Sequence, residues 1–124
     1  MKFMLDSNVI IAVALATNEA LRKRMSMHDE GDFAISAISY AEVIHGSVNE
    51  KPPELNRLHV LTEEMPVLPF DMAAARTYAS IPFRRASYDR LIAAHALSLG
   101  LTVVTENIKH FADVPGLKVE NWLV

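Results

Sequence analysis

Short apolar runs, separated by stretches with helical periodicity, limit what this chain can fold into. Within each run the apolar residues follow one another without alternation, as in Phe3-Met4-Leu5. Such runs are typical of strands that are buried on both faces of a parallel sheet. Strands that alternate with helices imply right-handed crossovers and helices on both sides of the sheet, so we predict an α/β fold with a central, mostly parallel sheet. The predicted strands are 3–5, 33–35, 67–70 and 101–104, with a short fifth at 117–120.

The helical stretches between these runs carry start and stop signals. Asp71 and Ser87 are good N-caps for the helices that follow them, and Gly100 is a typical C-terminal stop. Pro69 suits an edge strand, because proline has no N–H group to donate to a neighbour. His95 lies on the apolar stripe of the most regular helix, so we expect a core histidine. The predicted helices are 8–16, 18–28, 36–48, 53–65, 71–81 and 87–100.

Length and composition predict one soluble domain. A chain of 124 residues with 51% hydrophobic residues fits a single domain, 1–124, with one core. The absence of cysteine excludes disulfides, thiolate metal sites and cysteine nucleophiles, and it fits a reducing cytosol. No signal-peptide pattern is present, and no apolar stretch approaches the ~20 residues that span a bilayer. The net charge of -3 argues against tight, unspecific nucleic-acid binding, so any such contact must be local.

Four carboxylate or amide residues are predicted to meet at one edge of the sheet. Asp6 follows the first strand and 105–107 follows the fourth, so both lie at the carboxyl edge, where open α/β sheets bind ligands. Glu42 and Asp89 are expected in helix N-terminal turns that point at this edge. Simpler structural roles exist as well: Asp6 can cap a helix, and Asp89 can complement a helix dipole. Ser39 and Glu42 match a capping box, but none of these roles explains why all four residues converge.

Carboxylates that lie close together repel one another, so this cluster must either take up protons or bind a cation. Oxygen ligands without cysteine favour Mg²⁺ or Mn²⁺, which proteins often hold together with a substrate phosphate. A phosphate held by a metal ion indicates phosphodiester hydrolysis. The glycine-rich patterns of nucleotide-binding loops are absent, and neither order nor spacing supports an acyl-transfer triad.

Five short motifs occur in order between residue 3 and Trp122. They are MLDSN at 4–8, ISAISYAE at 35–42, YDRLIAAHA at 88–96, VTEN at 104–107, and Phe111 with VPGL at 114–117. Each motif is weak alone, but the ordered set closely resembles the PIN-domain ribonucleases of the VapC toxin type. The resemblance implies a three-layer α/β/α fold and an endoribonuclease that depends on Mg²⁺ or Mn²⁺. It also implies a homodimer in the prokaryotic cytoplasm and an antitoxin, encoded by an adjacent gene, that blocks the site.

The resemblance assigns roles to the polar residues at the sheet edge. Asp6, Glu42 and Asp89 match the invariant acids of the family, and Asn107 matches the usual polar residue of its fourth motif. These four are therefore the candidate catalytic residues, and Asp6 and Asp89 are the candidate metal ligands. The candidate RNA-binding residues are Ser7, Asn8, Thr105, Arg84 and Arg85.

Two departures from the family pattern concern the site itself. His110 stands where many members carry a fourth acid, so the metal site would have one carboxylate fewer. The segment between Tyr78 and Asp89 is also shorter than in many VapC toxins, and it brings Arg84 and Arg85 close to Asp89 in sequence. These arginines could bind phosphate beside the metal or simply lie in a solvated loop.

The predicted antitoxin needs an apolar surface on this protein. The helix around 9–15 is apolar on almost all sides, and the helix 38–48 is also rich in apolar residues. We expect these two helices to leave enough surface for an amphipathic antitoxin helix, which binds through anchors at helical spacing.

Two other function classes compete with a ribonuclease. The first is a PIN-like binding module that has lost catalysis, and the retention of all three matched acids argues against it. The second is a phosphatase or a signalling receiver, because an acid follows the first strand. A phosphatase of the haloacid class needs a second Asp where this chain has Asn8, and a receiver needs paired acids and a later lysine. A metal-dependent RNA cleavage assay distinguishes these classes.

Overall fold

Five parallel strands form the centre of the computed structural model, which describes residues 1–82 and 84–124. The sheet order is β3-β2-β1-β4-β5, and every neighbouring pair is parallel. This arrangement confirms the predicted parallel sheet, with β3 at an edge and Pro69 directly after its last residue. The strands are β1 (Phe3–Leu5), β2 (Phe33–Ser36), β3 (Val67–Leu68), β4 (Thr102–Val104) and β5 (Val119–Glu120).

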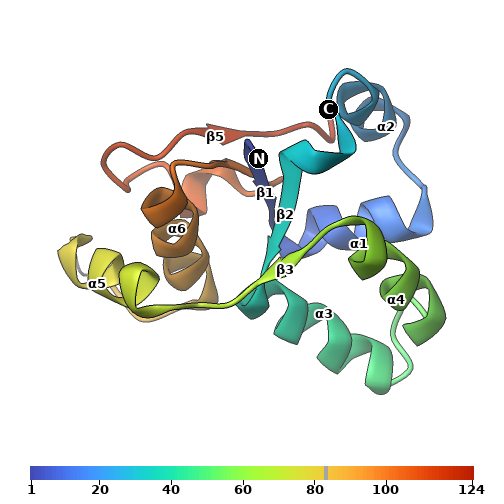
Figure 1. Cartoon of the computed structure of the whole chain (residues 1–124), viewed down its shortest axis with the longest axis horizontal. Coiled ribbons are helices and arrows are strands. Elements are labelled where there is room, and N and C mark those ends of the chain that lie inside the picture. Colours follow the sequence, from blue (N-terminus) through green and yellow to red (C-terminus); the bar gives the residue numbers. More distant parts are fainter. Residues whose placement is uncertain (83) are drawn as a thin grey trace.

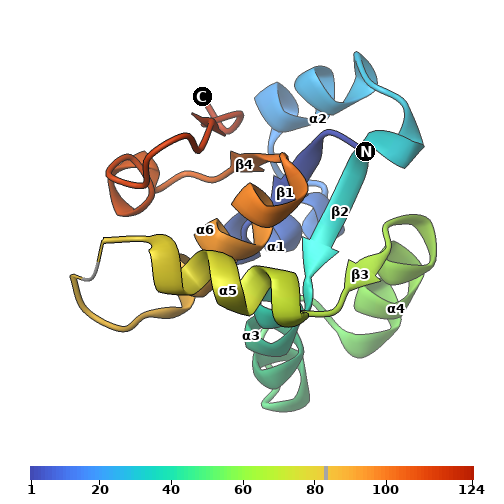
Figure 2. The ribbon, with the colours of Figure 1, turned by 60° about the vertical axis from the view of Figure 1, so that its left-hand side comes forward.

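Helices cover both faces of the sheet and make the fold a three-layer α/β/α structure, as predicted. α5 and α6 pack together on one side, and α1, α2 and α4 lie on the other side, while α3 continues beyond the carboxyl end of β2 (Figures 1 and 2). The helices are α1 (Ser7–Leu15), α2 (Glu19–Ser26), α3 (Ala37–Val48), α4 (Leu55–Glu64), α5 (Met72–Ser80) and α6 (Tyr88–Leu99), with short 3₁₀ turns η1 (Glu30–Asp32) and η2 (Ile108–His110). Among the described residues, none of these helices has the length and apolar character needed to cross a bilayer.

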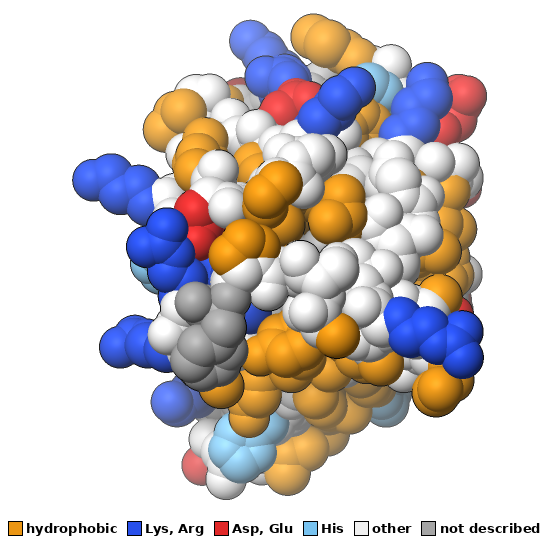
Figure 3. Space-filling view, turned by 90° about the vertical axis from the view of Figure 1, so that its left-hand side faces the viewer, with side chains coloured by type: hydrophobic (Ala, Val, Ile, Leu, Met, Phe, Trp, Pro, Cys, Tyr) orange, Lys and Arg blue, Asp and Glu red, His pale blue; other side chains and the backbone are white. Residues whose placement is uncertain are grey.

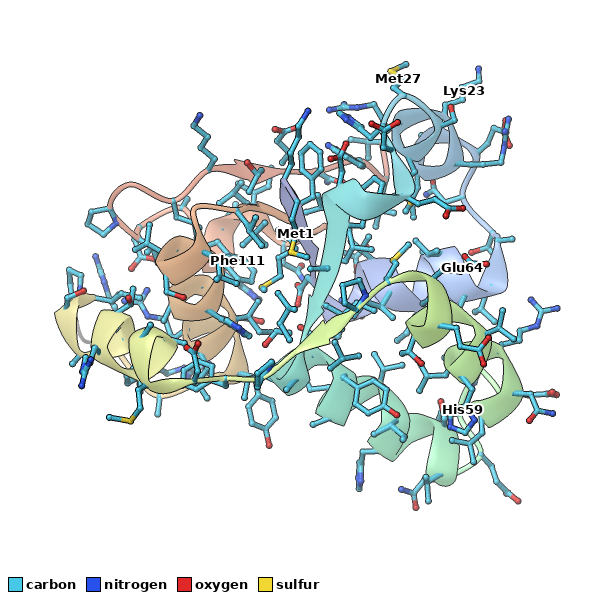
Figure 4. All side chains as sticks on the ribbon, viewed as in Figure 1. Met1, Lys23, Met27, His59, Glu64 and Phe111 are labelled. Carbon is cyan, nitrogen blue, oxygen red and sulfur yellow. The ribbon has the colours of Figure 1, made fainter. Side chains whose placement is uncertain are left out.

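The hydrophobic core has two parts, one on each side of the sheet. On the α1 side, Leu5 and Ile35 pack with Val9 and other residues of the surrounding helices. On the α6 side, Met4 packs with residues that include Phe111, which lies beside α6 (Figure 4). Complete burial of a side chain such as Leu or Phe stabilises a fold by roughly 1.5–3 kcal/mol. Because strand residues alternate between the two faces, the unbroken apolar runs supply both parts of the core.

Most of the predicted helix signals act as expected. Asp71 and Ser87 cap α5 and α6, and they accept hydrogen bonds from Ala74 N at 2.9 Å and Arg90 N at 3.3 Å. Gly100 ends α6 in the left-handed conformation with φ of 69°, which glycine adopts without steric cost. The predicted N-caps of α5 and α6 and the predicted stop of α6 are therefore confirmed.

The start of α3 corrects one prediction. The helix begins at Ala37 and is capped by Ser36, whose Oγ accepts a hydrogen bond from Ile38 N at 3.1 Å. Ser39 therefore lies inside the helix, so the expected capping box between Ser39 and Glu42 is wrong. The physical reason is that Ser36, the last residue of β2, reaches the free N–H groups of the helix one turn earlier. Glu42 consequently lies in the second turn of α3, and its carboxylate is not used by a cap.

His95 is a core histidine, as predicted. Its side chain is buried, and its Nδ1 lies 2.8 Å from Ser36 Oγ. Burial lowers the pKa of His95 below its ordinary value, although Asp71 and a backbone hydrogen bond at Pro69 oppose the shift. The hydrogen bond between His95 and Ser36 therefore joins α6 to the end of β2.

Candidate active site

Asp6 is buried at the carboxyl end of β1, directly beside β4. Its side chain is 3% exposed, and both of its oxygens accept hydrogen bonds. Oδ1 accepts from Ser7 N at 2.8 Å, which makes Asp6 the N-cap of α1, and Oδ2 accepts from Thr105 Oγ1 at 2.8 Å. The same carboxylate therefore caps α1 and lies at the edge of the sheet, so the structural role of Asp6 does not exclude a role in a site.

The environment of Asp6 disfavours its negative charge. Burial raises the pKa of Asp6 above its ordinary value, and the negative charge of Asp89 adds to the rise. Hydrogen bonds from Thr105 and Ser7 favour the anion but do not cancel the shift. A cation at this position would stabilise the ionised carboxylate.

Glu42 approaches Asp6 from α3. The hydroxyl of Ser7 lies 3.5 Å from Glu42 Oε1 and 3.4 Å from Asp6 Oδ1, so it stands between the two carboxylates and can donate its one proton to either, in a long and weak hydrogen bond. Burial raises the pKa of Glu42 above its ordinary value, and the charges of Asp6 and Asp89 raise it further. Three acids from three distant segments thus repel one another at a single edge of the sheet.

Asp89 lies in the first turn of α6, where the sequence predicted it, and it contacts His110. His110 Nδ1 lies 2.8 Å from Asp89 Oδ2. Asp89 is 29% exposed and His110 is 57% exposed, so solvent reaches this contact from outside. His110 therefore faces the acidic cluster.

The other predicted site residues fall into two groups. Ser7 and Asn107 are half-buried and Asn8 is exposed, so substrate can reach all three. Thr105 requires a correction, because its side chain is completely buried. Its hydroxyl donates to Asp6 and accepts a hydrogen bond from Asn107 N at 3.0 Å. Thr105 therefore orients Asp6, and its buried side chain does not offer a surface for the predicted substrate contact.

A cavity of about 380 Å³ opens next to Asp89. It lies between the loop before α6, the first turn of α6 and the turn around η2. Figure 3 shows this side of the molecule, where Lys and Arg side chains gather along one edge with an acidic side chain among them. The residues around the cavity are Arg84, Arg85, Ser87, Asp89, Arg90, Lys109, His110 and Asp113.

An ion pair that sequence reasoning missed holds the walls of this cavity together. Arg90 is 6% exposed, and its Nη1 lies 2.9 Å from both carboxylate oxygens of Asp113. Its Nη2 donates to Pro82 O, and Arg84 Nε lies 3.1 Å from Asp113 Oδ2. Burial tends to raise the pKa of Asp113, but Arg90 and Arg84 hold it below its ordinary value. The only sign of this ion pair in the sequence is Asp113, an acid shortly after His110, and sequence spacing does not identify Arg90 as its partner.

The acidic cluster fits a divalent cation by its donor chemistry. As the side chains stand, no three His, Cys, Asp or Glu residues converge on one point within the described part of the chain. The oxygens of Asp6 and Asp89 are instead hydrogen bonded to protein groups. The three carboxylates supply the oxygen ligands that Mg²⁺ and Mn²⁺ prefer. Burial is the main cause of the raised pKa values of Asp6 and Glu42, repulsion by neighbouring acids adds to the rise, and a bound cation would oppose both effects.

The sequence of this chain is similar to a known domain family and to known endonucleases. The PIN domain family matches residues 3–117 of this chain. The tRNA(fMet)-specific endonuclease VapC of Shigella flexneri is 33% identical over 131 residues, and the match covers 98% of each chain.

Solved structures with the same fold come from complexes called VapBC. The complex from Salmonella typhimurium, bound to DNA, contains a chain with a TM-score of 0.81 and 32% identity, covering 98% of both chains. VapBC2 from Rickettsia felis, bound to a promoter DNA fragment, gives a TM-score of 0.84 and 25% identity, covering 98% of this chain and 99% of the other. These likenesses extend over nearly the whole chain and not over one motif. The protein therefore belongs to the PIN-domain family and, within it, to the VapC-type ribonucleases.

Proposed function

We propose that this protein is a divalent-metal-dependent endoribonuclease that acts as the toxin of a toxin–antitoxin pair. The observation that supports the activity most strongly is the convergence of Asp6, Glu42 and Asp89 at one sheet edge, where the pKa values of Asp6 and Glu42 are raised. PIN-domain ribonucleases in general depend on divalent metal ions. We propose that the ion is Mg²⁺ or Mn²⁺.

The chain's own residues hold and orient the reacting groups. Asp6 and Asp89 would bind the cation, and Thr105 keeps Asp6 in place through its 2.8 Å hydrogen bond. Glu42 would orient the attacking water and accept its proton, while the Ser7 hydroxyl stands between Glu42 and Asp6. A bound cation would polarise the phosphodiester as a Lewis acid and neutralise negative charge. The water oxygen bonds to phosphorus as Glu42 takes its proton, the bond from phosphorus to the leaving ribose oxygen breaks, and that oxygen takes up a proton from solvent.

The direct test is RNA cleavage by the purified protein with EDTA, Mg²⁺ or Mn²⁺. The first substrate is tRNA(fMet), because the Shigella relative is named for it. Cleavage is expected with the metals and not with EDTA. Glu63→Gln, on the exposed surface of α4, is a control for acid substitutions at the site. A folded protein that binds RNA but cleaves none with either metal would favour the inactive binding module.

His110 is expected to change the metal preference. Mg²⁺ prefers oxygen ligands, whereas Mn²⁺ accepts imidazole better, so the wild-type enzyme should favour Mn²⁺. His110→Asp adds an anionic oxygen ligand and removes the imidazole from Asp89, so it should tighten Mg²⁺ binding. Each tenfold gain corresponds to about 1.4 kcal/mol. His110→Ala should reduce activity far less than Asp89→Asn.

Metal titrations of cleavage by the wild type, His110→Asp and His110→Ala test this expectation. His59→Asp is the control, because His59 is exposed on α4, on the other side of the sheet from α6 (Figure 4). The same metal dependence in all proteins would leave His110 without influence on the cation.

The antitoxin is proposed to bind the side of the molecule that α1 and α4 form. Two adjoining cavities of about 340 and 380 Å³ lie there, and both include Val13 of α1 and Glu64 of α4. On α1, Val9 and Ile10 are buried in the core, and residues 11–15 are half-buried and contribute to this surface. Val60, which is 56% exposed, extends the apolar surface along α4. An amphipathic antitoxin helix fits this surface by apolar contacts at helical spacing.

Co-expression with the product of the adjacent gene should recover a complex by affinity pull-down. Val60→Glu places a charge in the apolar surface and should reduce recovery of the antitoxin at least tenfold. Leu99→Glu, at an exposed position at the end of α6, should not reduce it. A wild-type toxin that remains alone and active in this experiment would contradict the assignment of an antitoxin.

We also propose that the protein forms a homodimer and acts in the prokaryotic cytoplasm, where its RNA substrates occur. Exposed apolar side chains on the α5 and α6 side, including Met72 and Tyr88, support self-association. The mass of the purified protein, measured by light scattering after gel filtration, tests the dimer directly.

A further inference from the structure

More cationic side chains line the cavity beside Asp89 than the acids of the cavity neutralise. Its charged lining is Arg84, Arg85, Arg90 and Lys109 against Asp89 and Asp113. Asp113 contacts Arg90 and Arg84, and Asp89 contacts His110. Within residues 1–82 and 84–124, neither Arg85 nor Lys109 has an acidic side chain within ion-pair distance, and both are exposed. An excess of cations at this place is notable in a chain with a net charge of -3.

The buried side chain of Arg90 holds the walls of the cavity together. Arg90 joins the first turn of α6 to Asp113 and to Pro82 O, so one guanidinium connects both sides of the cavity. Asp113 itself is partly open to solvent, but its loss would leave the buried guanidinium of Arg90 without its carboxylate partner. α6 also begins here, and the positive end of its dipole favours an anion.

We propose that this cavity binds a backbone phosphate of the RNA strand next to the phosphate that is cleaved. Arg85 and Lys109 are the contact residues, because neither forms an ion pair with an acid among the residues that the structure describes. Asp89 belongs both to the acidic cluster and to the cavity, so a strand with its reacting phosphate at the cluster would place a neighbouring phosphate here. This inference rests on the proposed ribonuclease function and adds a subsite to it.

RNA binding in the presence of EDTA tests the subsite without cleavage. The probe is a short, fluorescein-labelled single-stranded RNA, and anisotropy is measured at several NaCl concentrations. Arg85→Ala and Lys109→Ala should each weaken binding about 3- to 10-fold. Each should also lower the slope of log affinity against log salt by about 0.7, the value for one lost phosphate contact on a single strand. Arg85→Lys and Lys109→Arg should keep most of the slope.

Two cations outside the cavity serve as matched controls. Arg76 is exposed on α5, and Lys23 is exposed on α2, at the other end of the molecule (Figure 4). Arg76→Ala and Lys23→Ala should leave the salt slope unchanged. In steady-state cleavage with Mn²⁺, the double variant Arg85→Ala/Lys109→Ala should raise KM at least tenfold and change kcat less than threefold. Thermal melts should show that all variants fold like the wild type.

The outcomes separate this subsite from the ribonuclease function. If the double variant keeps the wild-type KM and salt slope while RNA is cleaved, the subsite is wrong and the ribonuclease function stands. If the wild type cleaves no RNA but the variants lose RNA affinity, the function is wrong and the phosphate contacts stand. Titration with inorganic phosphate alone should show no saturable binding in the millimolar range. Free phosphate that binds as tightly as the RNA would make the cavity a small-anion site and overturn the proposal.

Discussion

Replacing Asp89 by asparagine is expected to lower metal-dependent RNA cleavage at least about 100-fold. Substitution of groups that only support a metal ligand already costs about 10–100-fold, so loss of a charged ligand should cost at least the upper value. The folded structure should survive, because asparagine retains an oxygen near His110 and the α6 cap at Ser87 is untouched. The measurement is the cleavage rate with Mn²⁺, compared with the wild type and with Glu63→Gln.

The same substitution should leave the metal-free protein as stable as the wild type or slightly more stable. Burial raises the pKa of both Asp6 and Glu42 and the charge of Asp89 adds to the rise, so the folded state holds their protons more tightly than the unfolded state. A raised folded-state pKa means that stability falls as the pH rises above the unfolded values of 3.8 and 4.5. Removal of one repelling charge reduces this loss at pH 7. The loss of a favourable dipole interaction opposes the gain by ~0.3–1 kcal/mol.

Thermal melts with and without metal separate these effects. Mg²⁺ should raise the Tm of the wild type, because it binds the folded form only, and it should raise that of Asp89→Asn much less. The stability difference between the two proteins in EDTA should shrink as the pH falls toward 3.8. A loss of several degrees by Asp89→Asn in EDTA would instead make the residue a structural dipole complement.

Replacing Trp122 by alanine is expected to lower the free energy of unfolding by about 3–5 kcal/mol. Trp122 is completely buried among aromatic side chains from three distant segments. Its ring centroid lies 4.7 Å from that of Phe3 and 6.0 Å from that of Phe33, and His28 stacks on it at 5.4 Å. The guanidinium of Arg24 lies 5.0 Å from the ring centroid. A loss of this size is a large share of the roughly 5–15 kcal/mol that stabilises a typical domain.

The measurement for Trp122 is thermal or urea unfolding. The Tm should fall by roughly 10–20 °C. Trp122→Phe keeps a stacked ring but loses the 2.9 Å hydrogen bond to Glu120, so it should cost only about 1–2 kcal/mol. Val124→Ala is the control, because Val124 is 90% exposed.

The position of Trp122 predicts that its replacement by alanine does not change the cleavage rate of the folded protein. It contacts Phe3 at the start of β1, whereas Asp6 follows the end of that strand. At a temperature where Trp122→Ala remains folded, its cleavage rate should therefore equal that of the wild type. A variant that unfolds like the wild type would show that this aromatic cluster does not stabilise the domain.

The sequence by itself determined the class of fold and the edge where the acids meet. Short apolar runs between helical stretches are typical of buried parallel strands, and Asp71, Ser87 and Gly100 act on their own helices, so both signals are local. The order of strands and helices then places the residue after each strand at one edge. The capping box at Ser39 failed because Ser36 is an equally good cap one turn earlier, and local pattern could not rank the two.

Only the tertiary structure decided which side chains touch. Three contacts join segments that are far apart in sequence. They are the ion pair of Arg90 with Asp113, the contact of His110 with Asp89, and the hydrogen bond from the buried Thr105 to Asp6. Such contacts depend on how two faces pack, and burial then sets the pKa of a carboxylate such as Asp6. Periodicity and spacing record neither packing nor burial, because these arise from the whole core at once.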